Sequence, residues 1–147
     1  VTIEDSAELK FAHHPHVVRL EAREASIEGE GAVTIRDLVT NALRMRPDRI
    51  LVGEVRGEEA LDLLDAWNTG HPGGAATLHA NSAQEGLTRL KSLVSRNKSA
   101  PSEIEPLIGE AVHVVVHIAR TPEGGRRIQE ILEVSGYVDG RYITKTL

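Results

Sequence analysis

The chain has 147 residues, of which 40% are hydrophobic and 27% charged, and its formal net charge is −5. This length suits one globular domain with a hydrophobic core, no apolar run is long enough to span a membrane, and the acidic balance argues against a general nucleic-acid-binding surface. The sequence contains no cysteine, which excludes disulfides and thiolate metal sites and fits a reducing compartment.

The first predicted strand, residues 1–3, runs directly into two carboxylates, Glu4 and Asp5. A second short strand is predicted at residues 17–20, and a polar loop follows it. Ligands of parallel α/β sheets bind outside the carboxyl ends of the strands. Paired acids at a strand end therefore indicate a polar site at that edge of the sheet.

The next predicted element is a helix that begins with a capping box. Thr34 and Asp37 have the spacing of this motif, apolar residues follow at helical spacing, and Pro47 ends the helix. Further strands and helices alternate along the chain. This alternation predicts an α/β fold with a mostly parallel sheet.

The strand at residues 50–52 carries the most informative motif of the sequence. It is apolar and ends in Gly53 and Glu54, with Arg56 two residues further on. A buried parallel strand that ends in a carboxylate presents this group at the carboxyl edge. We expect Gly53, which has no side chain, to leave room for a ligand to approach.

A helix is predicted at residues 58–68, followed by a glycine-rich loop and a strand at residues 75–78. His71 lies in the loop, and His79 directly follows the strand. Two more capping patterns, each at the start of an apolar helix, then occur at Ser82 with Glu85 and at Ser102 with Glu105.

The last third of the chain is predicted to be mainly strand. Residues 114–118 and 127–134 are two such segments, and Asp139-Gly140 is a hairpin turn signal before residues 141–143. The sequence therefore predicts a C-terminal β-hairpin.

Three of these segments together resemble the secretion ATPases, the RecA-like motors of type II and type IV secretion, conjugation and pilus assembly. Glu4, Asp5 and Glu8 look like the Asp box of this family, residues 50–56 like its Walker B strand, and residues 70–79 like its His box. The resemblance implies a RecA-like P-loop NTPase core, with a mostly parallel sheet flanked by helices. It also implies that the full protein uses ATP and Mg²⁺.

By this resemblance, Glu54 is the candidate carboxylate that activates water. Glu4 contacts the water shell of Mg²⁺ or shares the work of Glu54, and the sequence leaves this division open. His79 is the expected γ-phosphate sensor. A zinc site formed by His71, His79, Glu4 and Glu54 is the less favoured alternative, because Mg²⁺ prefers oxygen ligands.

Four more residues are expected to sense or neutralise phosphate charge: Arg44, Arg56, His71 and Asp5. The two arginines bracket the Walker B-like strand and would act in the same or the neighbouring subunit. The alternative for each arginine is a salt-bridge network with nearby acids.

The sequence contains no Gly-x-x-x-x-Gly-Lys-Ser/Thr motif, the phosphate-binding loop of such motors. We therefore expect residues 1–147 to be the C-terminal portion of an ATPase domain, without its N-terminal domain and Walker A loop, and to be inactive alone. The resemblance implies that the full protein is a hexamer, cytoplasmic and peripheral at the inner membrane, with secretion or conjugation channel proteins as partners. Sequence-specific nucleic-acid binding is not expected.

Conjugal-transfer ATPases match more of the chain than the Tad-type pilus-assembly ATPases, which match mainly the first half. Both remain as alternatives, together with a non-catalytic oligomerisation or interaction module.

Overall fold

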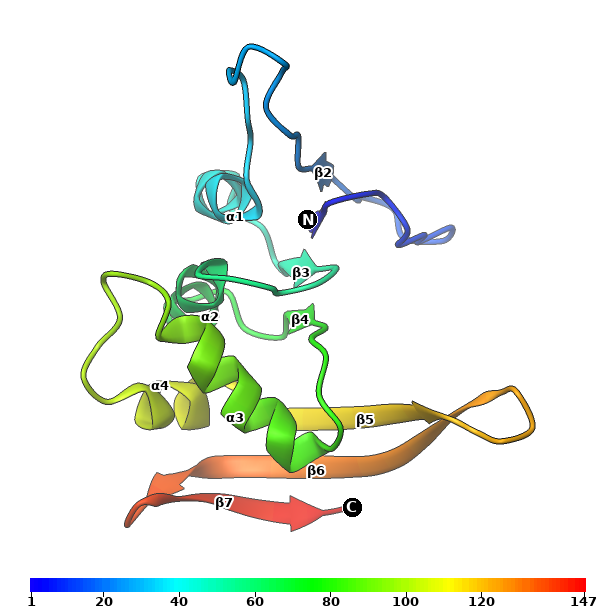
Figure 1. Cartoon of the computed structure of the whole chain (residues 1–147), viewed down its shortest axis with the longest axis vertical. Helices are drawn as coiled ribbons and strands as arrows, with labels where there is room; N and C mark the ends of the chain where they lie inside the picture. The colour runs from blue at the N-terminus through cyan, green and yellow to red at the C-terminus, as the bar shows by residue number, and fades with distance from the viewer. The chain divides into compact units, whose positions relative to one another are not determined.

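The computed structural model describes all residues, 1–147, and divides them into two compact units. Unit 1 comprises Val1–Thr77 and unit 2 comprises Leu78–Leu147. Figure 1 shows the helices and strands of both units along the chain. None of the helices is both long enough and apolar enough to cross a membrane.

Unit 1 contains a four-stranded sheet in which every pairing is parallel, in the order β2-β1-β3-β4. Its elements are β1 (Thr2–Glu4), β2 (Arg19–Glu21), α1 (Ile35–Leu43), β3 (Leu51–Val52), α2 (Glu59–Asn68) and β4 (Ala75–Ala76). Ile3 of β1 pairs with Val52 of β3, so the residues that follow these two strands meet at the same edge. This arrangement confirms the predicted parallel α/β sheet.

The core of unit 1 lies between the central strands and the helices α1 and α2. Ile3, Val39, Ile50 and Leu64 are at most 1% exposed. At the start of α1 the Thr34 hydroxyl accepts a hydrogen bond from the Asp37 N–H at 3.1 Å, and the Asp37 carboxylate accepts one from the Thr34 N–H at 2.9 Å. The predicted capping box is thus confirmed. The Asp37 carboxylate also accepts a hydrogen bond from the Thr34 hydroxyl, and the bonds from this hydroxyl and the Thr34 N–H lower the pKa of Asp37.

Unit 2 combines two helices with a three-stranded antiparallel sheet in the order β5-β6-β7. Its elements are α3 (Ala83–Val94), α4 (Ile104–Ala111), β5 (Val114–Arg120), β6 (Arg126–Val138) and β7 (Arg141–Thr146). Asp139 and Gly140 connect β6 and β7 with φ angles of 52° and 78°. Such a left-handed turn matches the twist of a hairpin, and the predicted C-terminal hairpin is confirmed.

The helices of unit 2 pack on one face of its sheet. Leu93 and Ile108 are fully buried, and Leu132 and Val134 of β6 are nearly so. A Cβ added at Gly109 would lie 2.9 Å from the backbone of Gly136, so α4 and β6 need this glycine for their close contact.

Two of the predicted helix caps differ in the structure. The N-cap of α4 is Glu103, without a side-chain hydrogen bond, so the predicted capping box of Ser102 and Glu105 is wrong. Glu105 instead forms an ion pair with Lys91 of α3, because a charged partner from another helix outcompetes the local motif. At α3, Ser82 caps the helix as predicted, but the Glu85 carboxylate accepts its hydrogen bonds from Asn81.

Candidate functional site

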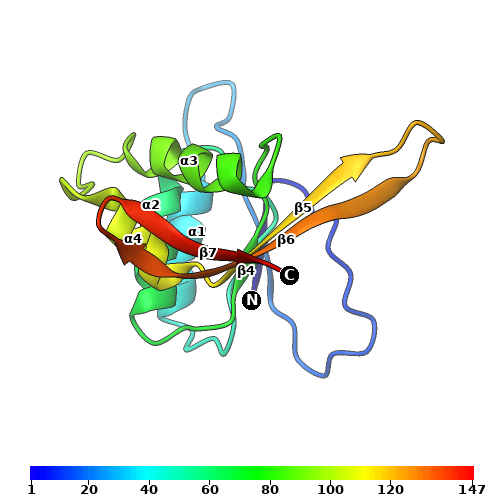
Figure 2. The same cartoon turned by 90° about the horizontal axis from the view of Figure 1, so that it is seen from below.

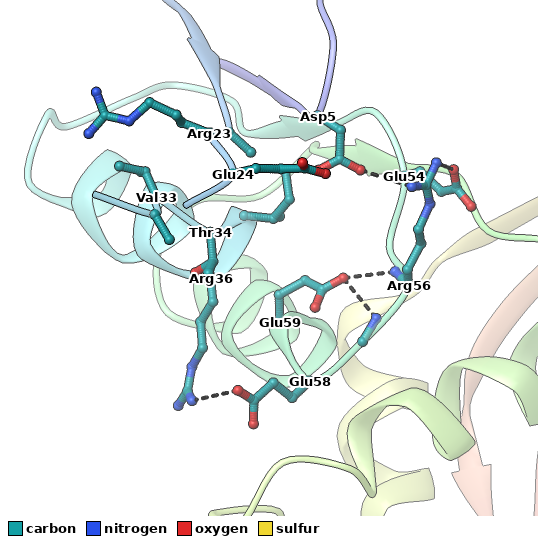
Figure 3. Close-up of a pocket in the computed structure, with 14 residues that line it drawn as sticks. Asp5, Arg23, Glu24, Val33, Thr34, Arg36, Glu54, Arg56, Glu58 and Glu59 are labelled. Carbon is teal, nitrogen blue, oxygen red and sulfur yellow. Dashed lines mark hydrogen bonds and ion pairs between the residues drawn. The ribbon is translucent and has the colours of Figure 1, made fainter. Parts of the chain in front are cut away.

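Charged side chains of unit 1 gather at the carboxyl edge of its sheet, around an open cleft of about 690 Å³. The cleft is lined by residues that follow β1, β2 and β3 and by the first residues of α1 and α2, as Figure 3 shows. Among them are Asp5, Arg23, Glu24, Thr34, Arg36, Glu54, Arg56, Glu58 and Glu59. The sheet topology therefore brings together the Asp-box and Walker B-like segments.

Glu4 is the most buried carboxylate at this edge, with an exposed fraction of 5%. Its Oε1 accepts hydrogen bonds from the N–H groups of Glu8, at 3.1 Å, and Leu9, at 3.0 Å. One oxygen of Glu4 is thus used to hold the loop that follows β1. The other carboxylate oxygen of Glu4, Oε2, accepts no hydrogen bond.

Gly53 lies against the side chain of Glu4. A Cβ added at Gly53 would be 2.9 Å from Glu4 Cγ and 3.3 Å from Oε1. The expectation that Gly53 leaves room for a ligand is therefore wrong, because the Glu4 side chain fills this space. Gly53 is needed for the close packing of the Asp-box and Walker B-like segments.

Glu54, Arg56 and Asp5 form one ion-pair network across two strand ends. The Arg56 guanidinium donates to Glu54 at 2.5 Å and contacts Asp5 at 3.1 Å. The hydrogen bond and the charge of Glu54 raise the pKa of Arg56. Arg56 thus neutralises one carboxylate from each segment, and the predicted salt-bridge alternative describes its position in this structure.

Hydrogen bonds within unit 1 fix the backbone on either side of Glu54. The Thr77 hydroxyl donates to the Gly53 carbonyl oxygen at 2.5 Å, and the Val55 N–H donates to the Thr77 carbonyl oxygen at 2.9 Å. The Glu59 carboxylate accepts from the N–H groups of Arg56, at 2.7 Å, and Gly57, at 2.9 Å. The backbone on both sides of Glu54 is therefore held in place by hydrogen bonds.

Sequence reasoning missed Glu59, Arg36 and Thr77. Arg36 of α1 contacts Glu58 at 3.3 Å and Asp62 at 3.0 Å, which joins the starts of α1 and α2 at the cleft. An acid in the first turn of a helix is a recognisable capping signal and could have identified Glu59. The sequence held no signal for the partners of Arg36, because they are more than twenty residues away.

The other predicted residues lie elsewhere. Arg44 caps the C-terminal end of α1, whereas the N-terminal end lines the cleft, about 13 Å away along the nine-residue helix. His71 follows α2, donates its N–H to the Ala66 carbonyl oxygen at 3.3 Å, and has a buried Nδ1 without a hydrogen-bond partner. His79 belongs to unit 2, where it precedes α3.

No group of three His, Cys, Asp or Glu side chains is arranged to hold a metal ion. The structure therefore gives no support to the zinc alternative. Magnesium sites in phosphate-transfer proteins use one or two carboxylates, waters and the substrate phosphates, so they need no all-protein cage. Glu4 Oε2 and the carboxylate of Glu54 fit such a partial ligand set.

The fold and the site define the class of this protein: a parallel α/β domain that collects acids and arginines at the carboxyl edge of its sheet. The family described as type II/IV secretion system protein matches residues 1–135. The chain belongs to this family, which confirms the resemblance seen in the sequence motifs.

Individual relatives agree with this assignment. A putative conjugal transfer protein of Mycobacterium tuberculosis is 51% identical over 131 residues, which are 89% of this chain and 37% of the relative. The probable conjugal transfer protein TrbB of Sinorhizobium fredii is 42% identical, over 97% of this chain and 40% of its own length. The chain thus spans about two fifths of the length of these relatives.

A solved structure shows the same fold. The crystal structure of the VirB11 ATPase from the Brucella suis type IV secretion system, in complex with sulphate, superposes with a TM-score of 0.76 and 37% identity. The match covers 88% of this chain and 38% of the VirB11 chain. The predicted α/β fold is confirmed by this similarity as well as by the strand pairing.

Proposed function

We propose that this chain is part of a motor that hydrolyses Mg-ATP to energise a type IV secretion or conjugation system. The observation that carries the proposal is the network of Glu54, Arg56 and Asp5, which spans two adjacent strand ends beside the cleft. The family membership and the names of the relatives, a conjugal transfer protein and a VirB11 ATPase, support the same reaction. They favour conjugation over pilus assembly.

In this proposal Glu54 is the carboxylate that orients and deprotonates the attacking water. Glu4 is less suited to the role, because it is buried and one of its oxygens binds two backbone N–H groups. Arg56 forms an ion pair with Glu54. The Arg56 side chain is 66% exposed, so its guanidinium is able to turn from Glu54 towards a phosphate.

Bound Mg²⁺ would neutralise phosphate charge, with Glu4 and Glu54 as its nearest protein carboxylates. The phosphate loop, absent from this sequence, would supply most contacts to the triphosphate. Arg44 and the histidines His71 and His79 would act at the interfaces of a hexamer or as phosphate sensors. The full protein would work at the inner membrane against channel proteins.

The decisive experiment is Glu54→Gln in the full-length protein. The substitution keeps the shape of the side chain but removes the base, so turnover should fall about 100-fold or more while ATP binding is retained. Phosphate release and nucleotide titration measure the two effects. Glu110→Gln, an exposed acid of α4, is the matched control and should hydrolyse ATP at the parent rate.

If Glu54→Gln hydrolyses ATP at the parent rate, Glu4 becomes the candidate for the base. If Glu4→Gln were fully active as well, the non-catalytic interaction module would replace the motor. His79→Ala should lower turnover and reduce the difference between the ATP-bound and ADP-bound conformations. Residues 1–147 alone should show no measurable turnover and should form no stable hexamer.

A further inference from the structure

The turn end of the β5–β6 ribbon, which we name the basic arm (residues 118–128), extends beyond the helices of unit 2 (Figure 2). It contains three arginines and one acid. Arg120 and Arg126 are directly paired across the two strands, and Arg127 pairs with Ala119. Like charges in opposite positions destabilise a strand pair. None of the three arginines forms an ion pair, so no acidic side chain, Glu123 of the turn included, offsets this repulsion.

The basic arm also exposes aliphatic side chains. Ile118 and Ile128 are neighbours across the strands and are 55% and 53% exposed. β7 pairs only with the part of β6 from Leu132 to Val138, so no third strand flanks the arm. Val116, 47% exposed, continues this apolar surface along β5. Paired aliphatic residues beside uncompensated arginines are a surface suited to an acidic partner with an apolar tip.

Unit 1 carries a segment with these properties, which we name the acidic loop (residues 24–30). It contains Glu24, Glu28 and Glu30 and no basic residue. Ile27 at its tip is fully exposed. The loop is an ordered turn, because the Ser26 N–H donates to the Glu30 carbonyl oxygen at 2.8 Å and a bridge between Arg23 and Val33 closes its base.

We propose that the basic arm of one copy docks on the acidic loop of a second copy. Ile27 packs against Ile118 and Ile128, and the arginines pair with Glu28 and Glu30. Arm and loop are different surfaces, so the contact is head-to-tail and closes into a ring when the rotation between copies permits it. This inference rests on the homo-oligomer of the proposed function and assigns one of its interfaces.

The contact is small beside the roughly 1,000 Å² that a stable interface buries, so it acts together with other surfaces of the full protein. Its contribution is orientation and selection of the correct partner surface, which opposite charges supply. Exposed charge pairs are screened by salt. The proposal therefore predicts that assembly weakens as ionic strength rises.

The first test exchanges charges in the full-length protein. Arg126→Glu with Arg127→Glu, or Glu28→Lys with Glu30→Lys, should raise the concentration for half-assembly at least 10-fold, measured by sedimentation velocity. All four substitutions in one chain should restore assembly. Arg89→Glu with Lys98→Glu makes the same charge change at exposed positions of α3 and the loop after it, and should leave assembly unchanged.

Assembly that is unaffected by either exchange, or not restored by the combination, overturns the proposal. A loss caused by the arm exchange alone indicates that another segment or protein occupies the arm, which also overturns it. The proposal is also overturned if the parent protein remains monomeric at all concentrations.

The second test uses cysteine pairs, which the cysteine-free sequence of residues 1–147 makes practical. Full-length Ile27→Cys mixed with full-length Ile128→Cys, with no other cysteine, should give disulfide-linked dimers on mild oxidation. Ile27→Cys mixed with Ser99→Cys, an exposed position of unit 2, should not. A cross-link that forms only within a single chain carrying both cysteines overturns the proposal. Neither readout needs turnover, so an inactive but cross-linked protein would count against the proposed function alone.

Discussion

Unit 1 and unit 2 are similar in size but use their charged residues differently. Unit 1 has 14 acidic and 8 basic residues, and unit 2 has 8 and 9. In unit 1 the parallel strands direct acids and arginines to one edge, where Arg56 connects two strand ends. In unit 2 the antiparallel strands alternate, so one face packs on helices while aliphatic residues such as Val114 and Ile118 remain exposed.

The difference shows how sheet type determines where function is found. A parallel sheet gathers the residues after its strands at one edge, so chemistry is expected there. An antiparallel sheet with one covered face offers the other face and its turns as contact surfaces. We therefore propose catalysis at the carboxyl edge of unit 1 and contact between copies at the basic arm.

The largest expected effect tests whether the two cores are separate. Leu64→Ala in unit 1 and Leu93→Ala in unit 2 each remove a buried side chain and should cost about 2–5 kcal/mol of stability. Hydrogen exchange of the full-length protein should show faster exchange mainly in the unit that carries the substitution. Equal acceleration in both units by either variant would mean that they unfold as one.

The next effect concerns the close packing at the site. Gly53→Ala places a Cβ 2.9 Å from Glu4 Cγ and should destabilise unit 1 by about 1–3 kcal/mol, as overpacking does. Gly86→Ala in α3 meets no atom closer than 3.6 Å and should be neutral or stabilising by up to about 1 kcal/mol. Thermal unfolding of the two variants and the parent measures these changes in stability. A neutral Gly53→Ala would show that Glu4 moves freely and is not fixed by the glycine.

Helix caps distinguish the units more finely. Thr34→Ala removes both hydroxyl contacts of a reciprocal capping box and should cost about 1 kcal/mol. Ser82→Ala removes a one-way cap and should cost no more than Thr34→Ala. The lowered pKa of Asp37 means that its contribution is present above its unfolded pKa and is lost as pH falls through the folded pKa. The stability difference between Thr34→Ala and the parent should therefore shrink in acid, measured by denaturation at several pH values.

The smallest expected effect on stability comes from the ionisation of Tyr142 in unit 2. Burial raises the pKa of Tyr142 to about 12, with a further contribution from the charge of Glu105. Because the folded pKa lies above the unfolded value of about 10, this contribution to stability is present below pH 10 and is lost as pH rises towards 12. Ultraviolet titration of the parent and Tyr142→Phe measures it. Ionisation of Tyr142 at the ordinary value would show that its hydroxyl is accessible to water.

The sequence determined the class of fold and the identity of the central motif. Alternation of strand and helix patterns predicted the parallel sheet, and Asp139-Gly140 predicted the last hairpin, because these signals depend on neighbours in sequence. The family motifs also placed Glu4 and Glu54 at adjacent strand ends. Their catalytic roles remain predictions.

Only the tertiary structure determined which side chains contact one another. Gly53 accommodates Glu4 instead of a ligand, and Arg56 joins Glu54 to Asp5. Glu105 leaves its local cap for Lys91, because a partner from another helix offers an ion pair. Such choices depend on distances between segments that lie far apart in the sequence. Propensity and periodicity describe one segment at a time and carry no information on these distances.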